Sequence, residues 1–394
     1  MSSTTDPTSI DSSAIDKVLQ DAVDSGAVPG VAAIAADRNG VIFEGAAGPT
    51  AAGGTDPMTV DTHFRIMSMT KMVATASALQ QVELGTLDLD APIADYCPEF
   101  ADVQVLEGFD GDTPKLRAPA SRATVRQLVT HTSGLGYWFW SEELVRWQSA
   151  TGTPNVLSGS NVIFTAPMLA DPGTRFVYGI NTDWLGKVTE AAAGMALDVA
   201  VKQNITGPLG MNDTGFQLAQ GWKDSTSPVH VKGEDGTWAD SGIELNQTPD
   251  YFTGGHGLYS TPRDYIKFQR ALLGGGELDG VRILSQATVD AAFTNQIGDL
   301  DFPPAIPTAD PTASFGFNAG PGYKWGYGLL LNTQDVPGMR RAYSGAWAGL
   351  CNTHFWVDPT SGVTASIYSN FLPFVPQEAM AMYADFERAL YAAL

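Results

Sequence analysis

The sequence predicts an α+β fold in which one antiparallel sheet, flanked by the N- and C-terminal helices, carries an inserted, mainly helical lobe. Both ends of the chain show helical and hairpin patterns, whereas the middle shows longer helical patterns separated by loops rich in Gly, Pro and Asp. The 394 residues also exceed the length of about 250–300 residues at which single cores stop growing. We therefore expect two lobes, one formed by residues 1–65 and 255–394 and the other by residues 66–254.

The two ends of the chain are predicted from apolar spacing and turn residues. Apolar side chains recur at helical spacing over 13–25, and Asn39-Gly40 between two apolar runs is a strong hairpin signal. The elements expected here are a helix over 13–25, strands over 31–36, 41–44, 354–357 and 363–368, and a helix over 376–390. The simplest architecture pairs these strands in one sheet and packs both terminal helices on it.

The middle of the chain predicts helices over 68–84, 122–130 and 183–197. Between and after them we expect loops rich in Gly, Pro and Asp at 105–120, 150–160 and 298–323. The last of these loops is expected to be a surface excursion.

The net charge limits the partners of the protein. The chain has 43 acidic and 22 basic residues, a formal net charge of −21 and only 9 lysines. Nucleic acid and anionic membrane surfaces both require basic patches, so neither is an expected partner. No run of 18 apolar residues low in charge is present, which predicts no membrane-spanning helix.

Targeting signals and metal-ligand patterns are absent from the sequence. Residues 1–9 lack the basic and apolar regions of a secretory signal and predict a polar tail on a cytoplasmic protein. Cys97 and Cys351 lie far apart in sequence; they could form one bridge, but free buried thiols are expected. The five histidines include no pair at i, i+4, so neither a metal site nor a cofactor is expected.

The most informative segment places Ser68 three residues before Lys71 at the start of a predicted helix. A spacing of three puts both side chains on one helix face. A serine hydroxyl becomes a nucleophile when a base takes its proton, and a desolvated lysine amine with a lowered pKa can be that base. The pattern alone favours an exposed N-cap serine with a solvated lysine, so a catalytic interpretation depends on the rest of the chain.

Further segments follow in a characteristic order. They are Leu87-Asp88-Leu89-Asp90, Thr130-His131-Thr132-Ser133-Gly134, Pro172-Gly173-Thr174-Arg175-Phe176-Val177-Tyr178, Tyr343-Ser344-Gly345 and His354-Phe355-Trp356-Val357-Asp358-Pro359. Together with Ser68 and Lys71, their order and spacing resemble the serine β-lactamase and penicillin-binding superfamily over about residues 13–390. Within it, the chain is most similar to the family VIII carboxylesterases, relatives of class C β-lactamases.

The resemblance implies roles for individual residues. Ser68 would be the acylated nucleophile, Lys71 its general base and Tyr178 the tyrosine that relays a proton. Tyr343-Ser344-Gly345 would form the strand opposite Ser68, and the backbone N–H groups of Ser68 and Ala346 would form the oxyanion hole.

Two departures from the family pattern favour esters over β-lactams. Position 343 is a tyrosine where β-lactamases carry a lysine, and the nearby Arg340 and Arg341 have no predictable direction. Ile180 replaces the asparagine of the Tyr-x-Asn motif, and the adjacent Asn181 is expected to substitute for it in binding substrate.

The remaining pocket residues are expected around the cleft. They are Tyr137, Trp138, Trp140, Trp347 and His256, with Tyr343, Ser344 and Gly345 on the strand. Core packing is the alternative for each aromatic residue. A His131-based hydrolase is disfavoured because no serine has Gly at both −2 and +2.

The sequence therefore predicts a serine carboxylesterase for small to medium acyl or aryl esters, as a monomer or homodimer without a cofactor. A β-lactamase, D-aminopeptidase or linear amide hydrolase using the same three residues is the first alternative. A catalytically weak binding or acyl-transfer protein is the second.

Overall fold

The centre of the molecule is a seven-stranded antiparallel sheet. The structure is a computed structural model that describes residues 10–394, so the polar tail predicted over 1–9 lies outside the described residues. The strand order is β13-β14-β15-β16-β17-β1-β2. The strands are β1 (Val31–Asp37), β2 (Val41–Ala47), β13 (Tyr323–Trp325), β14 (Leu330–Asn332), β15 (Gly345–Gly349), β16 (Thr353–Asp358) and β17 (Val363–Tyr368).

Strands from both ends of the chain lie next to each other in this sheet. β1 pairs with β2 around the Asn39-Gly40 turn, and β16 pairs with β17. β1 also pairs antiparallel with β17, with Ala32 opposite Tyr368. The two predicted hairpins and their union in one sheet are thus confirmed.

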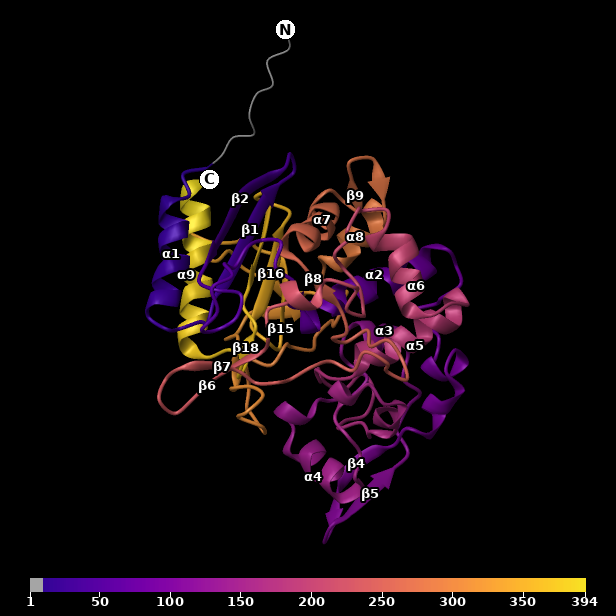
Figure 1. Ribbon diagram of the computed structural model, residues 1–394. Coiled ribbons are helices and arrows are strands. Elements are labelled where there is room, and N and C mark those ends of the chain that lie inside the picture. The colour runs from indigo at the N-terminus through magenta and orange to yellow at the C-terminus, as the bar shows by residue number, and fades with distance from the viewer. Residues whose placement is uncertain (1–9) are drawn as a thin grey trace.

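Helices cover both faces of the sheet. α1 (Ser13–Asp24) and α9 (Gln377–Ala393) lie side by side on one face, which Figure 1 shows in indigo and yellow. Side chains alternate along a strand, so Ala33 and Ala35 of β1 pack in the cluster beneath α1 and α9. Ala32 and Ile34 belong to the larger cluster on the opposite face, where α7 (Pro262–Leu273) packs against the sheet.

The chain between β2 and α7 is mainly helical, as predicted. Its central helix, α2 (Thr70–Glu83), packs against α5 (Asn181–Ala193) and is buried on nearly every side. The other α-helices of residues 10–394 are α3 (Val125–Val129), α4 (Glu142–Thr151), α6 (Leu197–Val201) and α8 (Gln286–Ala292).

The prediction of a loop over residues 105–120 is wrong in part. Residues 105–117 form a hairpin of β4 (Val105–Asp110) and β5 (Thr113–Arg117) that projects from the far end of the helical region (Figure 1). Its Gly and Asp residues make the turn of a hairpin, whereas the prediction assigned the whole segment to a loop. The remaining short strands are β3 (Phe64–Arg65), β6 (His230–Lys232), β7 (Trp238–Asp240), β8 (Tyr259–Ser260), β9 (Glu277–Leu278), β10 (Val281–Arg282), β11 (Ala305–Ile306), β12 (Phe317–Asn318) and β18 (Phe371–Leu372).

The chain segments that lead into the helical region and out of it are joined by a pair of short strands. β3 precedes Ser68, β8 follows His256, and the two strands pair, with Arg65 opposite Tyr259. One apolar cluster continues from the sheet into α2 and α5. The division into lobes of residues 1–65 with 255–394 and of residues 66–254 stays a prediction.

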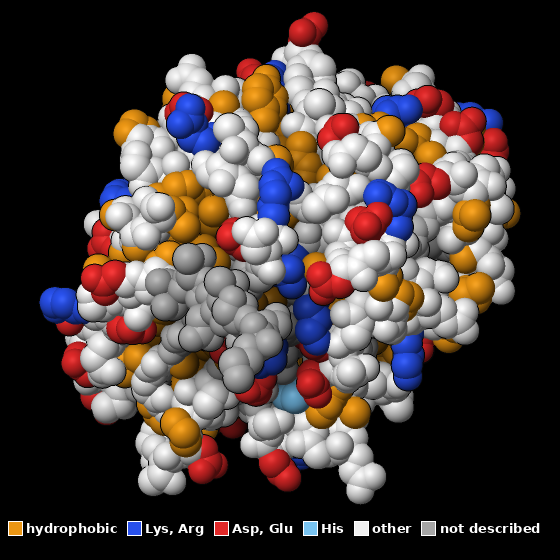
Figure 2. Space-filling model, turned by 90° about the horizontal axis from the view of Figure 1, so that it is seen from above, with side chains coloured by type: hydrophobic (Ala, Val, Ile, Leu, Met, Phe, Trp, Pro, Cys, Tyr) orange, Lys and Arg blue, Asp and Glu red, His pale blue; other side chains and the backbone are white. Residues whose placement is uncertain are grey.

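Three further observations concern the molecule as a whole. Cys97 and Cys351 are buried and free, as predicted. Over residues 10–394, the helices are all too short or too polar to cross a membrane. On the face shown in Figure 2, acidic and basic side chains are interspersed, so the net charge of −21 is not gathered there in one patch.

Candidate active site

Ser68 lies in a tight turn immediately before α2. The turn is a short 3₁₀ helix, Met67–Met69, and Met67 has a φ of 45°, which is a strained conformation for a side chain of this size. The first N–H groups of a helix have no partner within it, and the N–H of Met69 is the first to bond back, to the Ile66 carbonyl at 3.1 Å. Within residues 10–394 the N–H of Ser68 donates to no backbone carbonyl, so it can bind an oxygen that approaches the serine.

Lys71 contacts Ser68 from the first turn of α2. Its Nζ lies 3.1 Å from Ser68 Oγ, 2.9 Å from the hydroxyl of Tyr137 and 2.8 Å from the carbonyl oxygen of Gly255. The residue is only 1% exposed. Of its three partners, the Gly255 carbonyl can only accept a hydrogen bond, whereas both hydroxyls can also donate one. A neutral amine can therefore direct its lone pair at a hydroxyl while it still donates to Gly255.

Burial sets the electrostatics of this lysine. Loss of hydration lowers the pKa of Lys71, because the ammonium form is the one that water stabilises. The carboxylate of Asp183 opposes this change by favouring the ammonium form. Burial in turn raises the pKa of Asp183, and the charge of Lys71 counteracts it. The two groups therefore share a site in which the protonation of one depends on that of the other.

Asp183 lies behind Lys71 in a network that the sequence reasoning missed. Its carboxylate accepts hydrogen bonds from the hydroxyl of Tyr137 at 3.4 Å and from the backbone N–H of Gly255 at 3.3 Å. A Cβ at position 255 would come within 2.5 Å of this carboxylate, so only glycine permits the approach. The Gly254-Gly255 pair is the sequence signal that could have indicated a close backbone contact here.

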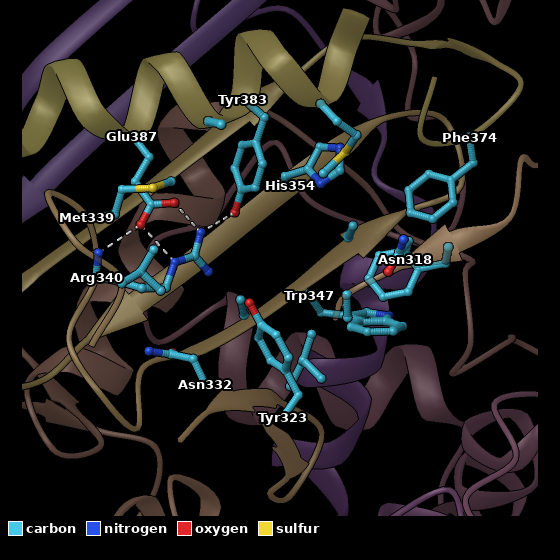
Figure 3. Close-up of a pocket in the computed structure, with 18 residues that line it drawn as sticks. Asn318, Tyr323, Asn332, Met339, Arg340, Trp347, His354, Phe374, Tyr383 and Glu387 are labelled. Carbon is cyan, nitrogen blue, oxygen red and sulfur yellow. Dashed lines mark hydrogen bonds and ion pairs between the residues drawn. The ribbon is translucent and has the colours of Figure 1, made fainter. Parts of the chain in front are cut away.

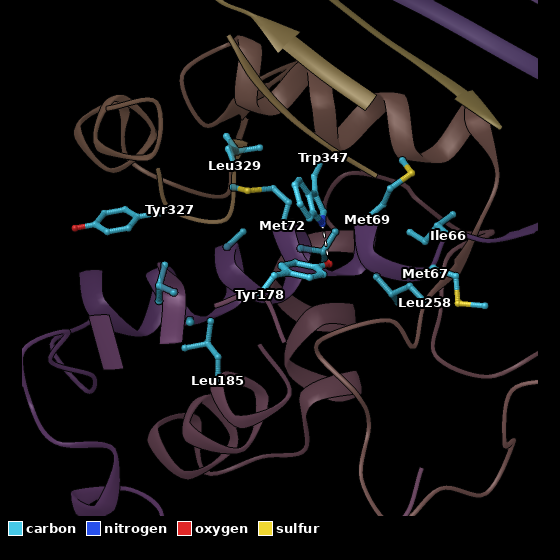
Figure 4. Packing of buried hydrophobic residues seen from close by; sticks show 14 of the residues in the cluster. Ile66, Met67, Met69, Met72, Tyr178, Leu185, Leu258, Tyr327, Leu329 and Trp347 are labelled. Carbon is cyan, nitrogen blue, oxygen red and sulfur yellow. Dashed lines mark hydrogen bonds between the residues drawn. The ribbon is translucent and has the colours of Figure 1, made fainter. Parts of the chain in front are cut away.

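Tyr178 closes the cluster on the side of the sheet. Its hydroxyl oxygen accepts a hydrogen bond from Trp347 Nε1 at 2.9 Å, which Figure 4 shows among the buried methionines of the Ser68 turn and α2. Lys71 Nζ lies 4.8 Å from the centre of the tyrosine ring. Burial raises the pKa of Tyr178, and the neighbouring Ser68 hydroxyl and Trp347 indole lower it in part. The phenol therefore stays protonated at neutral pH and is suited to give a proton.

The end of β15 forms the wall opposite the nucleophile. A Cβ on Gly349 would lie 2.3 Å from the carbonyl oxygen of Ile66, and Thr353 Oγ1 donates to the same oxygen at 3.1 Å. β14 pairs with β15 only at Gly345 and Ala346. Residues 347–349 thus pair with β16 on one edge, and no strand of the described part of the chain pairs with the other edge. A free strand edge beside a nucleophile can pair with an extended substrate.

The structure places the predicted Tyr343-Ser344-Gly345 motif away from Ser68. Tyr343 is 46% exposed, Ser344 donates its hydroxyl to the Arg341 carbonyl, and a Cβ on Gly345 would meet Leu329. The structure therefore places these three residues away from Ser68, and their role in substrate binding stays a prediction.

The register also argues against Ala346 as an oxyanion donor. Ala346 lies opposite Leu330 of β14 and Trp356 of β16, so both edges of the strand are occupied at this residue. The first backbone N–H beyond β15 belongs to Leu350, next to Gly349, and it donates to no backbone carbonyl within residues 10–394. This turn lies against the Ser68 turn through the contact of Gly349 with Ile66.

Two more predicted substrate contacts are instead structural. The amide of Asn181 is fully buried, donates to the carbonyls of Leu135 and Val177, and accepts from the hydroxyl of Ser133. It is committed to holding two loops together and cannot replace the family's asparagine in the cleft.

His256 likewise does not border the cleft. It is 5% exposed, and its Nδ1 lies 2.9 Å from Thr253 Oγ1 and 3.9 Å from Asp183 Oδ1. Burial lowers the pKa of His256 to about 3, so the ring is neutral behind the Asp183 carboxylate.

The predicted aromatic residues divide into three groups. Tyr137 binds Lys71 directly, and Trp347 binds Tyr178. The ring of Trp140 lies 5.5 Å from that of Tyr178, at the rim of the site. The Nε1–H of Trp138 donates to Asp310, and the indole is buried beneath the segment that contains Asp310. Trp140 and Trp347 therefore lie where a substrate could reach them, whereas Trp138 supports the segment above.

The comparison with known proteins bears on this arrangement. The sequence model of the family described as Beta-lactamase matches residues 15–390. The chain belongs to the β-lactamase family. This confirms the resemblance to the serine β-lactamase and penicillin-binding superfamily and the β-lactamase/transpeptidase-like fold, whereas the finer likeness to family VIII carboxylesterases and the roles of Ser68, Lys71 and Tyr178 stay predictions.

Individual relatives within the β-lactamase family are an esterase and acyltransferases. The chain is 32% identical to the lovastatin esterase of Penicillium rubens over 87% of this chain and 89% of that protein. It is 31% identical to monacolin J acid methylbutanoyltransferase of Aspergillus terreus over 85% and 83% of the two chains. The solved structure of simvastatin synthase (LovD) from Aspergillus terreus has a TM-score of 0.81 at 27% identity and covers 96% of this chain and 97% of that one.

Proposed function

We propose that this β-lactamase-family protein is a serine carboxylesterase that cleaves neutral esters through an acyl-enzyme on Ser68. One observation carries the proposal, the approach of Lys71 Nζ to 3.1 Å from Ser68 Oγ in a buried site. Burial lowers the pKa of this lysine, so part of it is neutral near neutral pH and can take the serine proton. The similarity to lovastatin esterase supports ester cleavage as the reaction.

The first half of the reaction forms the acyl-enzyme. Neutral Lys71 takes the proton of Ser68, whose oxygen attacks the ester carbonyl carbon. The carbonyl oxygen becomes an oxyanion, which the N–H groups of Ser68 and Leu350 stabilise. The tetrahedral intermediate then collapses, and the alkoxide leaves with a proton from Tyr178, which Lys71 reprotonates. The leaving alcohol carries one proton, and the enzyme retains the acyl group.

The second half returns the enzyme to its starting state. A water molecule attacks the acyl carbon and passes one proton to the oxygen of Tyr178, while the phenol passes its own proton to neutral Lys71, which becomes an ammonium. The second tetrahedral intermediate expels Ser68, which recovers the proton from Lys71. The raised pKa of Tyr178 keeps the phenol protonated, so it can donate to a leaving oxygen, and it can relay a proton from water only as its own proton moves to Lys71.

The charges around the cleft favour neutral substrates. Arg340 pairs with Glu387 and Arg341 with Asp335, so neither arginine near position 343 is available to hold a substrate carboxylate at Ser68. Aromatic side chains of Trp140 and Trp347 at the rim suit apolar acyl or aryl groups. A β-lactamase, D-aminopeptidase or linear amide hydrolase would use the same cluster, and its substrates are the controls of the test.

A panel of neutral esters, a chromogenic cephalosporin and a linear anilide tests this proposal. We expect ester turnover to exceed the others, and Ser68→Ala to remove it by about four orders of magnitude. Ser68→Ala should also abolish labelling by a fluorophosphonate, whereas Ser77→Ala, a buried serine on the same helix, should keep both. Cephalosporin turnover at rates comparable to those of esters, or activity in Ser68→Ala, would refute the proposal.

Acyl transfer to an alcohol is the second candidate reaction. Two observations favour it: the similarity to a methylbutanoyltransferase, and the low exposure of Ser68 and Tyr178, 9% and 7%, which limits access of water to an acyl-enzyme. The ratio of transesterification to hydrolysis, measured with an aryl ester and added primary alcohols, distinguishes the two. If the acyl group is transferred to water and to the added alcohol in proportion to their bulk concentrations, the protein is not a dedicated acyltransferase.

A further inference from the structure

His131 combines two destabilising features in one buried residue. Its φ of 54° lies in the left-handed region, where glycine, asparagine, aspartate and histidine are the residues usually found. Its Nδ1 is fully buried and bonds to no residue in 10–394. A buried polar atom without a partner destabilises the fold, and glycine would satisfy the backbone without one. The backbone conformation therefore does not explain why position 131 carries a ring.

The imidazole packs against the phenol of Tyr178, the proposed proton donor. The centres of the two rings lie 4.8 Å apart, closer than the rings of Tyr137 and Trp140 lie to the same phenol, at 5.3 and 5.5 Å. The main chain makes a second link, because the carbonyl oxygen of His131 accepts a hydrogen bond from the N–H of Val177 at 2.8 Å. Both the ring and the backbone of His131 therefore hold the segment that carries the phenol.

Trp325 completes a circle of four rings that includes this contact. Its indole stands nearly perpendicular to the imidazole of His131, with the ring centres 5.2 Å apart, and lies 4.8 Å from the indole of Trp347. Trp347 in turn donates its Nε1–H to the hydroxyl oxygen of Tyr178. Trp325 is itself fixed, because it is fully buried and its Nε1–H donates to the carbonyl oxygen of Val129 at 3.3 Å. The phenol is thus held between His131 and Trp347, which both pack on the same indole.

The two supports of the phenol differ in how closely they are packed. Trp347 also lines a cavity of about 240 Å³, together with Asn318 and Phe374 (Figure 3). A cavity removes packing contacts on one side of a ring, so this indole is held less firmly. The imidazole of His131 is only 1% exposed and lies among three other rings. His131 is therefore the more closely packed of the two supports.

The imidazole is not the base of the reaction. Burial and the positive charge of Lys71 lower the pKa of His131 well below its usual value, so the ring is a weak base and stays neutral. The hydroxyl of Ser68 instead lies 3.1 Å from Lys71 Nζ. His131 therefore acts on ester cleavage through the phenol that it packs against.

We propose that His131 is a positioning residue for Tyr178, which keeps the phenol hydroxyl where the leaving oxygen of the ester receives its proton. This role rests on the proposed function, in which Tyr178 is the proton donor. A shift of about 1 Å in a reacting group can lower a rate about 100-fold, so a ring that prevents the phenol from swinging has a measurable effect. The effect is specific, because only a leaving group that needs a proton responds to it.

His131→Asn tests this role, because asparagine tolerates a positive φ and removes the ring. It should lower kcat/KM for an alkyl ester about 10–100-fold, since the alkoxide needs the proton of Tyr178. Its kcat/KM for a nitrophenyl ester and its rate of labelling by a fluorophosphonate should stay within about two-fold of wild type, since both leaving groups depart without a proton. Phe176→Leu is the matched control, because it removes a ring that packs on His131 and Trp325 and should affect both esters equally.

A double variant separates positioning from a general loss of packing. In a Tyr178→Phe background, His131→Asn should lower kcat/KM for the alkyl ester by less than about two-fold, because the group that His131 positions is gone. Trp325→Phe loosens the indole that supports the imidazole and should show the same dependence on the leaving group. It replaces His131→Asn if circular dichroism shows that this variant does not fold.

The positioning role is overturned if His131→Asn shows no loss, equal losses with both esters, or its full loss again in the Tyr178→Phe background. Each of these results leaves the proposed function intact, because the wild-type protein still cleaves esters and is labelled at Ser68. Failure of the fluorophosphonate to label Ser68 in the wild-type protein would instead refute the proposed function.

Discussion

Lys71 Nζ lies 2.9 Å from the hydroxyl of Tyr137, a residue expected from the sequence to line the substrate pocket. The site therefore contains two tyrosines with different surroundings. Tyr137 contacts Lys71 and Asp183, whereas Tyr178 contacts Trp347 and the serine. Burial raises the pKa of both phenols, so neither is a phenolate at neutral pH. Their different partners predict different roles, Tyr137 as a positioning residue and Tyr178 as the proton donor.

Replacing each tyrosine by phenylalanine separates these roles. Tyr178→Phe should lower kcat about 10²–10⁴-fold for an alkyl ester, because its alkoxide needs a proton to leave. The loss should be smaller for a nitrophenyl ester, whose leaving group needs none. Tyr137→Phe removes one hydrogen bond to the lysine and should cost about 10–100-fold, equally for both esters. Steady-state kinetics with the two substrates check this. A stronger leaving-group dependence in Tyr137→Phe than in Tyr178→Phe would reverse the assignment.

The pH dependence of acylation follows from the coupling of Lys71 with Asp183. The base is the neutral amine, so activity should rise with pH through the pKa of Lys71, which burial lowers to about 7. Asp183 favours the ammonium form and therefore raises this pKa. Asp183→Asn removes that charge, so the acidic limb of the kcat/KM profile should move to lower pH. Glu234→Gln, an exposed change, is the control. An unchanged limb in Asp183→Asn would show that the carboxylate has only a structural role.

The indole of Trp347 is predicted to make Tyr178 a stronger acid and therefore a better proton donor. Its Nε1 hydrogen bond lowers the pKa of Tyr178. Trp347→Phe should therefore make the phenol a weaker acid, and loss of about 1 kcal/mol corresponds to a roughly five-fold lower kcat for alkyl esters. Trp238→Phe, which removes an indole bonded to the distant Gly26 carbonyl, is the matched control. Equal rates for wild type and Trp347→Phe would show that this hydrogen bond does not act on the reaction.

Position 343 is predicted to be irrelevant to substrate choice. Its side chain is 46% exposed and stands before β15, outside the cleft. Tyr343→Lys should therefore leave the rates with esters and with a chromogenic cephalosporin unchanged within about two-fold, as expected of a surface substitution. A gain in cephalosporin hydrolysis would show that a lysine at position 343 reaches the substrate. It would support the prediction that Tyr343-Ser344-Gly345 faces Ser68.

Local sequence patterns predicted the parts of the structure that depend on residues close together in the sequence. The Asn39-Gly40 turn predicted its hairpin because the turn conformation is a property of those two residues. The spacing of Ser68 and Lys71 predicted their contact because one helical turn brings them together. The same reasoning could not find Asp183 or Gly255, since Gly255 meets Lys71 across 184 residues of sequence and no local pattern encodes that contact.

The position of the Tyr343-Ser344-Gly345 motif away from Ser68 has a geometric cause. Gly345 and Gly349 are four residues apart on β15, so both point to the same face of the sheet, and alternation cannot distinguish them. Only the register distinguishes them, since β14 covers the edge of the strand at Gly345 and ends before Gly349. The sequence predicted the correct strand, but which part of it borders Ser68 depends on where a neighbouring strand stops.

Gly349 is therefore predicted to be indispensable for the site. A Cβ at this position would lie 2.3 Å from both the Ile66 carbonyl oxygen and Thr353 Oγ1, and neither backbone nor a β-branched side chain can move away easily. Gly349→Ala should push the Ser68 turn off β15, lower the free energy of unfolding by about 1–3 kcal/mol and reduce ester hydrolysis far more than stability alone explains. Gly40→Ala, with nothing within 4 Å of the added Cβ, is the control. Thermal unfolding and kcat/KM of the two variants decide the matter, because full activity in Gly349→Ala would mean that the end of β15 is not the wall that faces the nucleophile.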